Sequence, residues 1–375
     1  MESKRIYILG AGSSIAHSKG DFPSIKQFFI KAREEGADIK QDFGQIVAYI
    51  KKITGRNIAT GKAILDIESL FTNLEIDIEK RTTPTLLEIR QQLLMIIKKV
   101  LYLKERKMPR LNGDYNNFSR LLNVSDTIIT FNWDLLLDNV MGRESTLGAG
   151  VSEAENVSSC RPQLIGQYNE FIYNISAYSE RTIGCLSPNL PYNKWNLKKG
   201  VYLKLHGSID WFYCLNEKCR AVNKVFPLLQ PLDKYFCSEC HESLETLLIP
   251  PVLNKDYRRS PFIRKIWNIA GKELSSASEV IIWGYGLPPT DFYATWLLRQ
   301  ARTDFLKKLV IINPRVISKK GRLQTSFVRK IYNIFLGVIK KGDLCLYESF
   351  SDFTEEKDVL VKYELGDKKE AYKSI

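Results

Sequence analysis

The feature that most restricts the fold of this chain is a set of short apolar runs that stop abruptly at a glycine or a polar residue. In residues 201–211 (VYLKLHGSIDW), Val201, Leu203 and Leu205 alternate as in a pleated strand, and His206 and Gly207 follow. Comparable runs occupy residues 5–9 (RIYIL), 127–131 (TIITF), 280–283 (VIIW), 309–312 (LVII) and, later, 344–347. The pattern predicts an α/β fold with a parallel sheet, whose strands end at the edge where ligands bind.

Helices are predicted between these strands, above all over residues 24–122. There, Phe43, Ile46, Val47 and Ile50 fall on one helical face, and Thr83 with Pro84 is typical of a helix start. A long helix follows, with apolar positions at Leu86, Leu87, Leu93, Leu94, Ile97, Val100 and Leu101. We expect these stripes to form core or a subunit interface. Further helices are expected at 135–141, 258–274, 292–302, from 324, and near the end, with a surface loop at 142–159 and no clear element in 160–200.

The first apolar run leads directly into Gly10, Ala11, Gly12, Ser13 and Ser14. Glycines after a first strand let the backbone approach a pyrophosphate, and the next helix offers its N-terminal amides. The third glycine of a GxGxxG fingerprint is missing, so a plain tight turn explains the same residues. The loop at 15–23 is a candidate to close over a cofactor.

Polar side chains follow two further strands. Asn132 and Asp134 come directly after residues 127–131, and His206, one of only three histidines, follows the strand at 201–205. At the carboxyl edge of a sheet these side chains are candidate site residues. Asn132 or Asp134 acting only as a helix cap is the alternative.

Four of the seven cysteines form two close pairs, Cys214 with Cys219 and Cys237 with Cys240. Two such pairs predict a tetrahedral four-thiolate zinc site of the structural kind. The first pair is wider than the usual CxxC, and chance clustering or a redox pair is the alternative. His241 is expected to be a bystander. This cysteine usage suits a reducing compartment better than a disulfide framework.

The net charge of +13 permits a polyanionic partner, but the basic residues are dispersed, so nucleic acid is not expected to be the primary ligand. No apolar run approaches the roughly 18 residues that span a bilayer. The first residues lead into a glycine turn and do not resemble a signal peptide. We therefore expect a cytoplasmic protein without membrane contact.

The order of these motifs resembles the sirtuin superfamily, most of all its bacterial sirtuin-like branch. The resemblance lies in GAGSS, FNWD, KLHGS, the two cysteine pairs, GYGLPPTD and INP, which span residues 6–314. It implies a single sirtuin-like domain over 1–375, with a Rossmann-like sheet, a helical insertion at 24–122 and a zinc-binding module at 212–248. It also implies NAD as the substrate and zinc as a structural ion.

The same resemblance implies a role for each matching residue. The NAD phosphates would be held by Gly10, Ala11, Gly12 and Ser14, and the nicotinamide ribose would be faced by Asn132 and Asp134. The general base would be His206, and the adenosine half would be lined by Gly284, Gly286 and Asn313. Zinc would be bound by Cys214, Cys219, Cys237 and Cys240.

Departures from the protein deacylases of this superfamily fall on the peptide side of the site. Phe131 stands where they carry Gln, and Pro23 follows Asp21 and Phe22 where they carry Arg. Their peptide-pairing Phe-Gly-Glu segment is replaced by residues 249–253 (IPPVL), in which two prolines remove backbone donors. The NAD-facing residues remain, so the combination favours hydrolysis of NAD by water.

Members of the branch that this chain resembles deplete NAD in defence against phage, as oligomers and in some cases with a HerA-type ATPase partner. The resemblance therefore implies an NAD hydrolase that acts in anti-phage defence as a homo-oligomer. Three alternatives remain open: a protein deacylase or ADP-ribosyltransferase, a non-catalytic sensor of NAD or ADP-ribose, and a nucleic-acid binder.

Overall fold

The computed structural model describes residues 4–24, 26–35, 44–57, 65–108, 113–123, 125–147, 201–221, 225–227, 232, 234–249, 261–288, 291–318, 322–340 and 343–359. Phe43, the expected loop at 148–159, residues 160–200 and the two prolines at 250 and 251 lie outside these ranges. None of the described helices is both long enough and apolar enough to cross a membrane.

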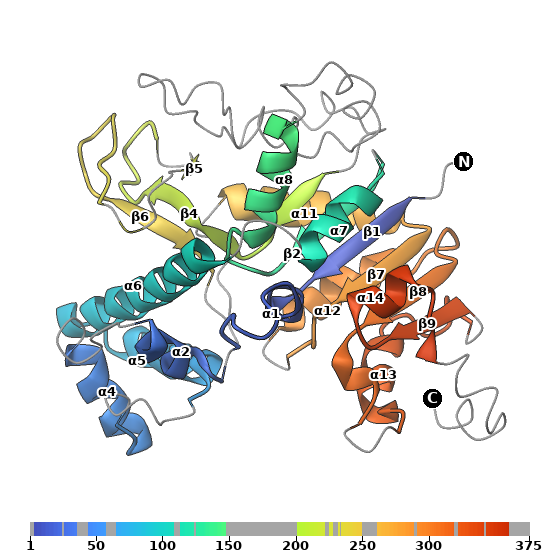
Figure 1. The fold of residues 1–375 in the computed structure, drawn as a ribbon. Coiled ribbons are helices and arrows are strands. Elements are labelled where there is room, and N and C mark those ends of the chain that lie inside the picture. The colour runs from blue at the N-terminus through green and yellow to red at the C-terminus, as the bar shows by residue number, and fades with distance from the viewer. Residues whose placement is uncertain are drawn as a thin grey trace.

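A six-stranded sheet forms the centre of the described structure (Figure 1). Its strands are β1 (Arg5–Leu9), β2 (Thr127–Thr130), β3 (Tyr202–Lys204), β7 (Glu279–Trp283), β8 (Lys308–Ile312) and β9 (Leu344–Tyr347). All neighbouring pairs are parallel, in the order β3-β2-β1-β7-β8-β9. Taken in chain order this is 3-2-1-4-5-6, the strand order of dinucleotide-binding Rossmann folds, with its switch point between β1 and β7. The predicted fold class is confirmed.

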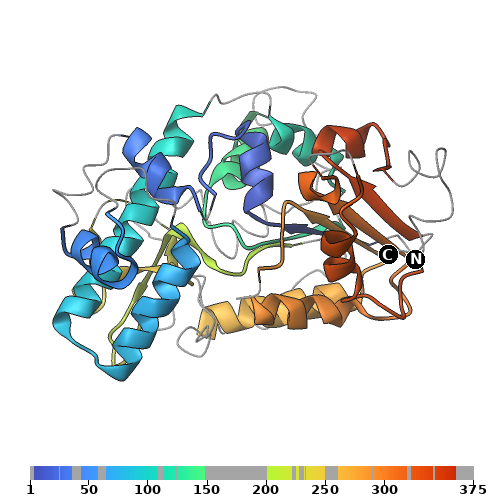
Figure 2. The same cartoon turned by 90° about the horizontal axis from the view of Figure 1, so that it is seen from below.

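Helices cover both faces of this sheet, as buried parallel strands require. The helices are α1 (Ala11–His17), α7 (Asp114–Leu121), α8 (Leu136–Leu147), α11 (Pro261–Ser275), α12 (Phe292–Leu298), α13 (Thr325–Tyr332) and α14 (Phe350–Thr354). Figure 2 shows α11 below the sheet and α1 and α7 above it. On that upper face, Phe118 of α7 packs against Tyr7 of β1, Trp283 of β7 and Phe350 of α14.

The described parts of residues 24–122 that precede α7 are mainly helical, as the sequence predicts. They form α2 (Phe28–Glu34), α4 (Gly44–Thr54), α5 (Ile67–Lys80) and α6 (Pro84–Lys107), which lie together beside the sheet (Figure 1). Thr83 caps α6 by accepting the Leu86 N–H at 3.2 Å, so the predicted helix start is confirmed.

Two details of the predicted helices need correction. Leu87, expected in core or a subunit interface, is not in the core: it is 44% exposed, because Leu86 and Leu87 are consecutive and point about 100° apart on a helix. The loop predicted for residues 142–159 was wrong for residues 142–147, since α8 continues to Leu147. Its residues 142–147 (GRESTL) contain no proline, which allows the helix to continue.

A second sheet is made of the antiparallel strands β5 (Val225–Pro227), β4 (Gly207–Cys214) and β6 (Leu244–Leu248). The sequence predicts a strand that ends at His206, but the chain passes at once into β4. Gly207 makes this possible: its φ is +77°, and a Cβ there would lie 2.0 Å from the Leu247 carbonyl oxygen. The strand after His206 was missed because it depends on pairing with β6, which is distant in sequence.

Candidate functional site

The glycine turn after β1 packs directly against the loop after β7, at the switch point of the sheet. The Gly12 N–H donates to the Gly284 carbonyl oxygen at 2.9 Å, and the Gly10 N–H donates to that of Trp283 at 3.0 Å. A Cβ on Gly12 would lie 2.6 Å from the Gly284 oxygen, so this approach requires glycine. The amides of Gly10 and Gly12 are therefore satisfied within the protein, and these two residues shape the turn.

Beneath this turn lies a buried group of hydroxyls from α1 and α7. Ser13 and Ser14 are 0% and 1% exposed. The Tyr115 hydroxyl hydrogen-bonds to both, at 2.8 Å and 2.9 Å, and burial raises the pKa of Tyr115. The Ser14 hydroxyl donates to Oδ2 of Asp134 at 2.8 Å. Tyr115 was not identified from the sequence, because it is some 100 residues from the glycine turn.

Asn132 and Asp134 both connect β2 to this group. The Asn132 amide donates to the Gly10 carbonyl oxygen at 3.1 Å and to the Ser14 hydroxyl at 3.0 Å. Oδ1 of Asp134 accepts the Leu136 N–H at 3.1 Å, which caps α8, while its Oδ2 accepts from Ser14. Burial raises the pKa of Asp134. Asp134 is thus both a helix cap and part of the polar group, so the two interpretations of this residue are not exclusive.

Two ionisable residues hydrogen-bond to the backbone that follows β2, and neither was predicted from the sequence. Lys204, fully buried in β3, donates to the Asp134 carbonyl oxygen at 2.6 Å and to Oδ2 of Asp138 at 3.0 Å. Oε1 of Glu105 accepts the Leu135 N–H at 2.6 Å. Burial, with the nearby charge of Asp134, raises the pKa of Glu105 well above its ordinary value. A lysine inside the apolar run 201–205 was the sequence signal for the first of these.

His206 lies next to Asn132 in the order of the sheet. Thr130 of β2 is in register with Lys204 of β3, so the residues two positions beyond each, Asn132 and His206, leave the sheet at the same level. His206 is 5% exposed. Its ring lies 5.0 Å from that of Phe131 and 6.3 Å from that of Trp267. A buried imidazole beside aromatic rings suits proton transfer away from bulk water.

The remaining predicted residues follow β7 and β8. Gly284 contacts the glycine turn as described, whereas Gly286 lies beside Arg315, whose Nη1 would be 3.3 Å from a Cβ at that position. Oδ1 of Asn313 accepts the Arg315 N–H at 2.9 Å and caps the short helix that follows β8. Arg315 was not predicted. Its guanidinium lies 4.6 Å from the centre of the Phe327 ring.

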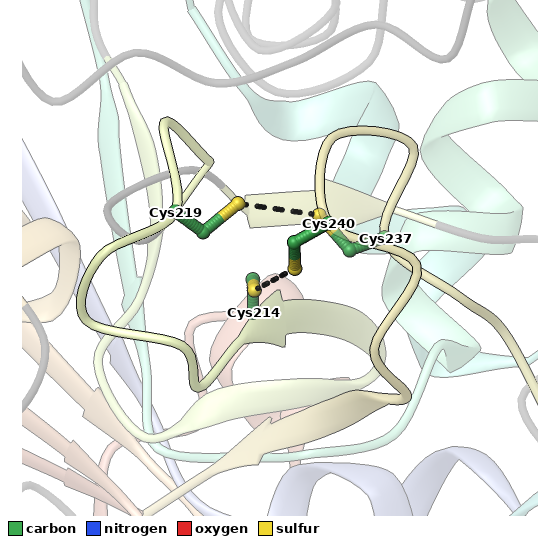
Figure 3. Close-up of side chains that lie close together, drawn as sticks. All are labelled: Cys214, Cys219, Cys237 and Cys240. Atoms are coloured by element: carbon green, nitrogen blue, oxygen red, sulfur yellow. Dashed lines mark hydrogen bonds between the residues drawn. The ribbon is translucent and has the colours of Figure 1, made fainter.

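The four predicted cysteines converge at the end of β4 and in the connection to β6 (Figure 3). Their sulfur atoms all lie within 4.8 Å of one another, with Cys214 and Cys240 at 3.5 Å and Cys219 and Cys237 at 3.6 Å. Disulfide bonds are excluded because they need about 2.05 Å. Zn–S bonds of about 2.3 Å in a tetrahedron place sulfurs about 3.8 Å apart. The four thiols are therefore spaced as in a structural zinc site, and they are the residues that would hold the ion.

No protein-family model and no curated protein matches this chain. Among solved structures, the chain is similar to a Sir2 homologue in complex with NAD, at 12% identity, covering 94% of this chain and 87% of the other with a TM-score of 0.40. It is also similar to a mutant Sir2 homologue in complex with 2′-O-acetyl ADP-ribose (13% identity, 89% and 93% covered, TM-score 0.38). A third structure, of a Sir2 enzyme, gives 10% identity, 95% and 90% coverage and a TM-score of 0.38. At these identities and TM-scores the likenesses decide neither family nor activity.

Proposed function

We propose that this chain is a sirtuin-like enzyme that binds NAD and hydrolyses it to nicotinamide and ADP-ribose. The observation that carries the proposal is the joint position of Asn132 and His206, each two residues beyond the end of the neighbouring strands β2 and β3, in a sheet with the dinucleotide-binding strand order. In this proposal residues 24–122 are a helical insertion and residues 212–248 a zinc-binding module of one domain.

The contacts of the glycine turn refine the proposed phosphate site. Because the amides of Gly10 and Gly12 are bonded to protein carbonyls, these residues bring the turn close to the switch point without donating to a phosphate. We assign direct contact with NAD to Ala11, whose side chain is exposed at the start of α1. Ser14, which is bonded to Asp134, acts by holding the turn to β2.

Gly284, Gly286 and Asn313 are proposed to line the adenosine half, with Arg315 as an additional cation beside them. On the other side of the switch point, Asn132 and Asp134 are proposed to face the nicotinamide ribose. Their side chains hydrogen-bond to the α1 turn, so both hold the ribose site in a fixed relation to the phosphate site.

The proposed reaction replaces the bond from C1′ of the ribose to nicotinamide by a bond from C1′ to a water oxygen. The bond to the nicotinamide nitrogen breaks, and its electron pair leaves with neutral nicotinamide while positive charge develops on the sugar. A water oxygen then bonds to C1′, and the water proton passes to the base. His206 is the proposed base, since an imidazole accepts a proton near neutral pH. Such assistance is worth about 10²–10⁴-fold in rate.

The preference for water over an acyl-lysine peptide is supported by Phe131. This residue stands where the deacylases have Gln, and its ring stacks on Tyr285 with centroids 4.4 Å apart. In addition, the Ile249 N–H donates to the His206 carbonyl oxygen at 2.9 Å, so this donor next to the base is already used within the protein. Both features favour a closed site for NAD and water.

Nicotinamide release from NAD by the purified protein tests this proposal. We expect release without peptide, and a loss of at least about 10²-fold in His206→Gln and Asn132→Ala. Asn333→Ala, which changes an exposed asparagine after α13, is the matched control and should retain full rate.

Each other outcome of this assay has a definite meaning. If nicotinamide is released only when an acyl-lysine peptide is present, the chain is a deacylase and not a hydrolase. If calorimetry shows that NAD binds but no nicotinamide is released, even after the proteins encoded beside this chain are added, the chain is a sensor. Salt-sensitive DNA binding that Asn132→Ala leaves intact would favour a nucleic-acid binder.

We further propose that NAD hydrolysis serves defence against phage, that the chain acts as a homo-oligomer, and that a HerA-type ATPase or another defence protein is its partner. Cells that express the wild type should lose NAD after infection and form fewer plaques, whereas His206→Gln cells should do neither. Protection without NAD loss, or protection by His206→Gln, would contradict this role.

A further inference from the structure

The loop between β7 and α12 directs a carboxylate toward His206. Asp291 occupies the N-cap position of α12, where an aspartate ordinarily accepts a hydrogen bond from the first helical turn, yet its side chain makes no cap hydrogen bond. Instead, its Oδ2 accepts a hydrogen bond from the Tyr285 hydroxyl, and its Oδ1 lies 4.0 Å from Nε2 of His206. The Asp291 carboxylate therefore faces the buried His206 imidazole instead of capping its own helix, which indicates that it interacts with that imidazole.

The surroundings strengthen this contact. The side chains of His206 and Asp291 are 6% and 3% exposed. The Phe131 ring lies 5.0 Å from the imidazole and 4.4 Å from the Tyr285 ring, and so packs against both. Charges interact more strongly in such apolar surroundings than in water. The 4.0 Å between Nε2 of His206 and Oδ1 of Asp291 is short enough for an ion pair when the imidazole is protonated, but too long for a direct hydrogen bond.

The described part of this loop contains one residue in an unusual backbone conformation. Leu287, a buried residue with a branched side chain, has a φ of +48°. Residues in this region of backbone space persist only where the surrounding structure holds them, and they cluster at functional sites. Its carbonyl oxygen accepts a hydrogen bond from Lys330 of α13, and the Asp291 N–H donates to the Pro288 carbonyl oxygen. These contacts fix the start of α12 and thus the place of the Asp291 carboxylate.

We propose that Asp291 is a positioning residue that orients the His206 imidazole and stabilises its protonated form. The proposal rests on the proposed function, in which His206 accepts a proton from water. That proton transfer creates an imidazolium, and a carboxylate beside Nε2 favours it. In the neutral imidazole, a proton on Nε2 faces Asp291, and the lone pair on Nδ1 is the one that accepts the proton.

Nitrogen NMR of the full chain, with ¹⁵N-labelled histidine, tests this coupling without any substrate. The sequence contains three histidines, so the His206 signals are assigned by their loss in His206→Gln. We expect the neutral ring to carry its proton on Nε2. In Asp291→Asn the titration midpoint of His206 should fall by about one pH unit or more, the effect of removing an opposite charge at this range.

Tyr285→Phe is the matched control, because it removes the Tyr285 hydroxyl that donates to Asp291 but keeps the Asp291 carboxylate and the aromatic ring. In this variant the titration midpoint of His206 should not fall. If Asp291→Asn does not fold, Asp291→Ser is used in its place. Serine is also a good N-cap residue, and this variant removes the same negative charge.

The rate of nicotinamide release supplies the second readout. Asp291→Asn should lower kcat at least about 10-fold, within the about 10²–10⁴-fold that a general base contributes. KM should change little, since Asp291 acts through His206.

An unchanged His206 midpoint in Asp291→Asn and Asp291→Ser would overturn the proposal, as would a midpoint that falls equally in Tyr285→Phe. Failure of the proposed function gives a different pattern. In that case the wild type releases no nicotinamide, while the NMR comparison still reports the coupling of the two side chains.

Discussion

The imidazole of His17 shows how a single residue makes the fold sensitive to pH. Its Nδ1 accepts the Tyr115 N–H at 3.3 Å, and its ring stacks on the Tyr115 ring with centroids 4.8 Å apart. Burial lowers the pKa of His17 below its ordinary value. The folded state therefore keeps this ring neutral at a pH where the unfolded chain binds a proton. Stability is then full above about pH 6.5 and is lost as the pH falls toward the folded pKa.

His17→Asn should remove this dependence, because the asparagine oxygen can accept the same N–H without binding a proton in this range. We expect the Tm of the wild type to fall between pH 7.5 and 5.5 by more than the Tm of His17→Asn, as measured by circular dichroism. A fall of equal size in both proteins would show that other groups cause the acid sensitivity.

At the scale of elements, α6 carries two buried lysines in opposite situations. Lys104 donates to Asp21 at 2.7 Å and lies 2.8 Å from Oε1 of Glu35, so it ties the loop after α1 and the end of α2 to this helix. Burial by itself would lower the pKa of Lys104, but these two partners outweigh it and raise the pKa. Lys98 contacts the second sheet through the Thr246 hydroxyl at 2.8 Å, and burial lowers its pKa to about 8.

The same substitution should therefore have opposite effects at the two positions. A pKa of about 8 in place of 10.5 corresponds to about 3 kcal/mol against the charged Lys98. This cost is present below pH 8 and is relieved as the pH rises to 10.5, where the unfolded chain also loses its proton. Lys98→Met should raise the Tm at pH 7 and lose that advantage near pH 10.

Lys104→Met should lower the free energy of unfolding by up to about 3 kcal/mol, because the buried Glu35 carboxylate loses a partner. Urea unfolding of both variants at pH 7 gives the comparison. Destabilisation of equal size would mean that the two lysines contribute through their alkyl chains and not through their charges.

At the scale of the whole molecule, the sequence predicts what contiguous residues encode. The strand Arg5–Leu9, the Thr83 cap and the four cysteines are each recognisable within a short window, and the structure has all three. Contacts between distant segments could not be predicted in this way. The approach of Asp291 to His206 and of Tyr115 to Ser13 depends on the strand order and on which helices cover it, and local patterns do not determine these.

The position of the cysteine cluster links zinc to the proposed active site. β4 runs from Gly207, next to His206, to Cys214, and it pairs with β6 at both of its ends, with a shift of register between Gly207 and Phe212. We therefore expect an ion bound at the Cys214 end to hold the two strands in place, and with them the backbone that carries His206. Structural zinc of this kind contributes directly to folding. We expect one zinc per chain by elemental analysis of protein purified without chelator.

Cys237→Ser should remove the zinc, lower the Tm and weaken NAD binding, while Cys345→Ser should retain all three properties. Cys345 lies in β9, outside the cluster, so this second variant separates loss of a ligand from loss of any thiol. NAD binding is measured by calorimetry on both variants and on wild type treated with a strong chelator. Full zinc in Cys237→Ser, or unchanged binding after complete removal of zinc, would mean that the second sheet holds His206 through strand pairing alone.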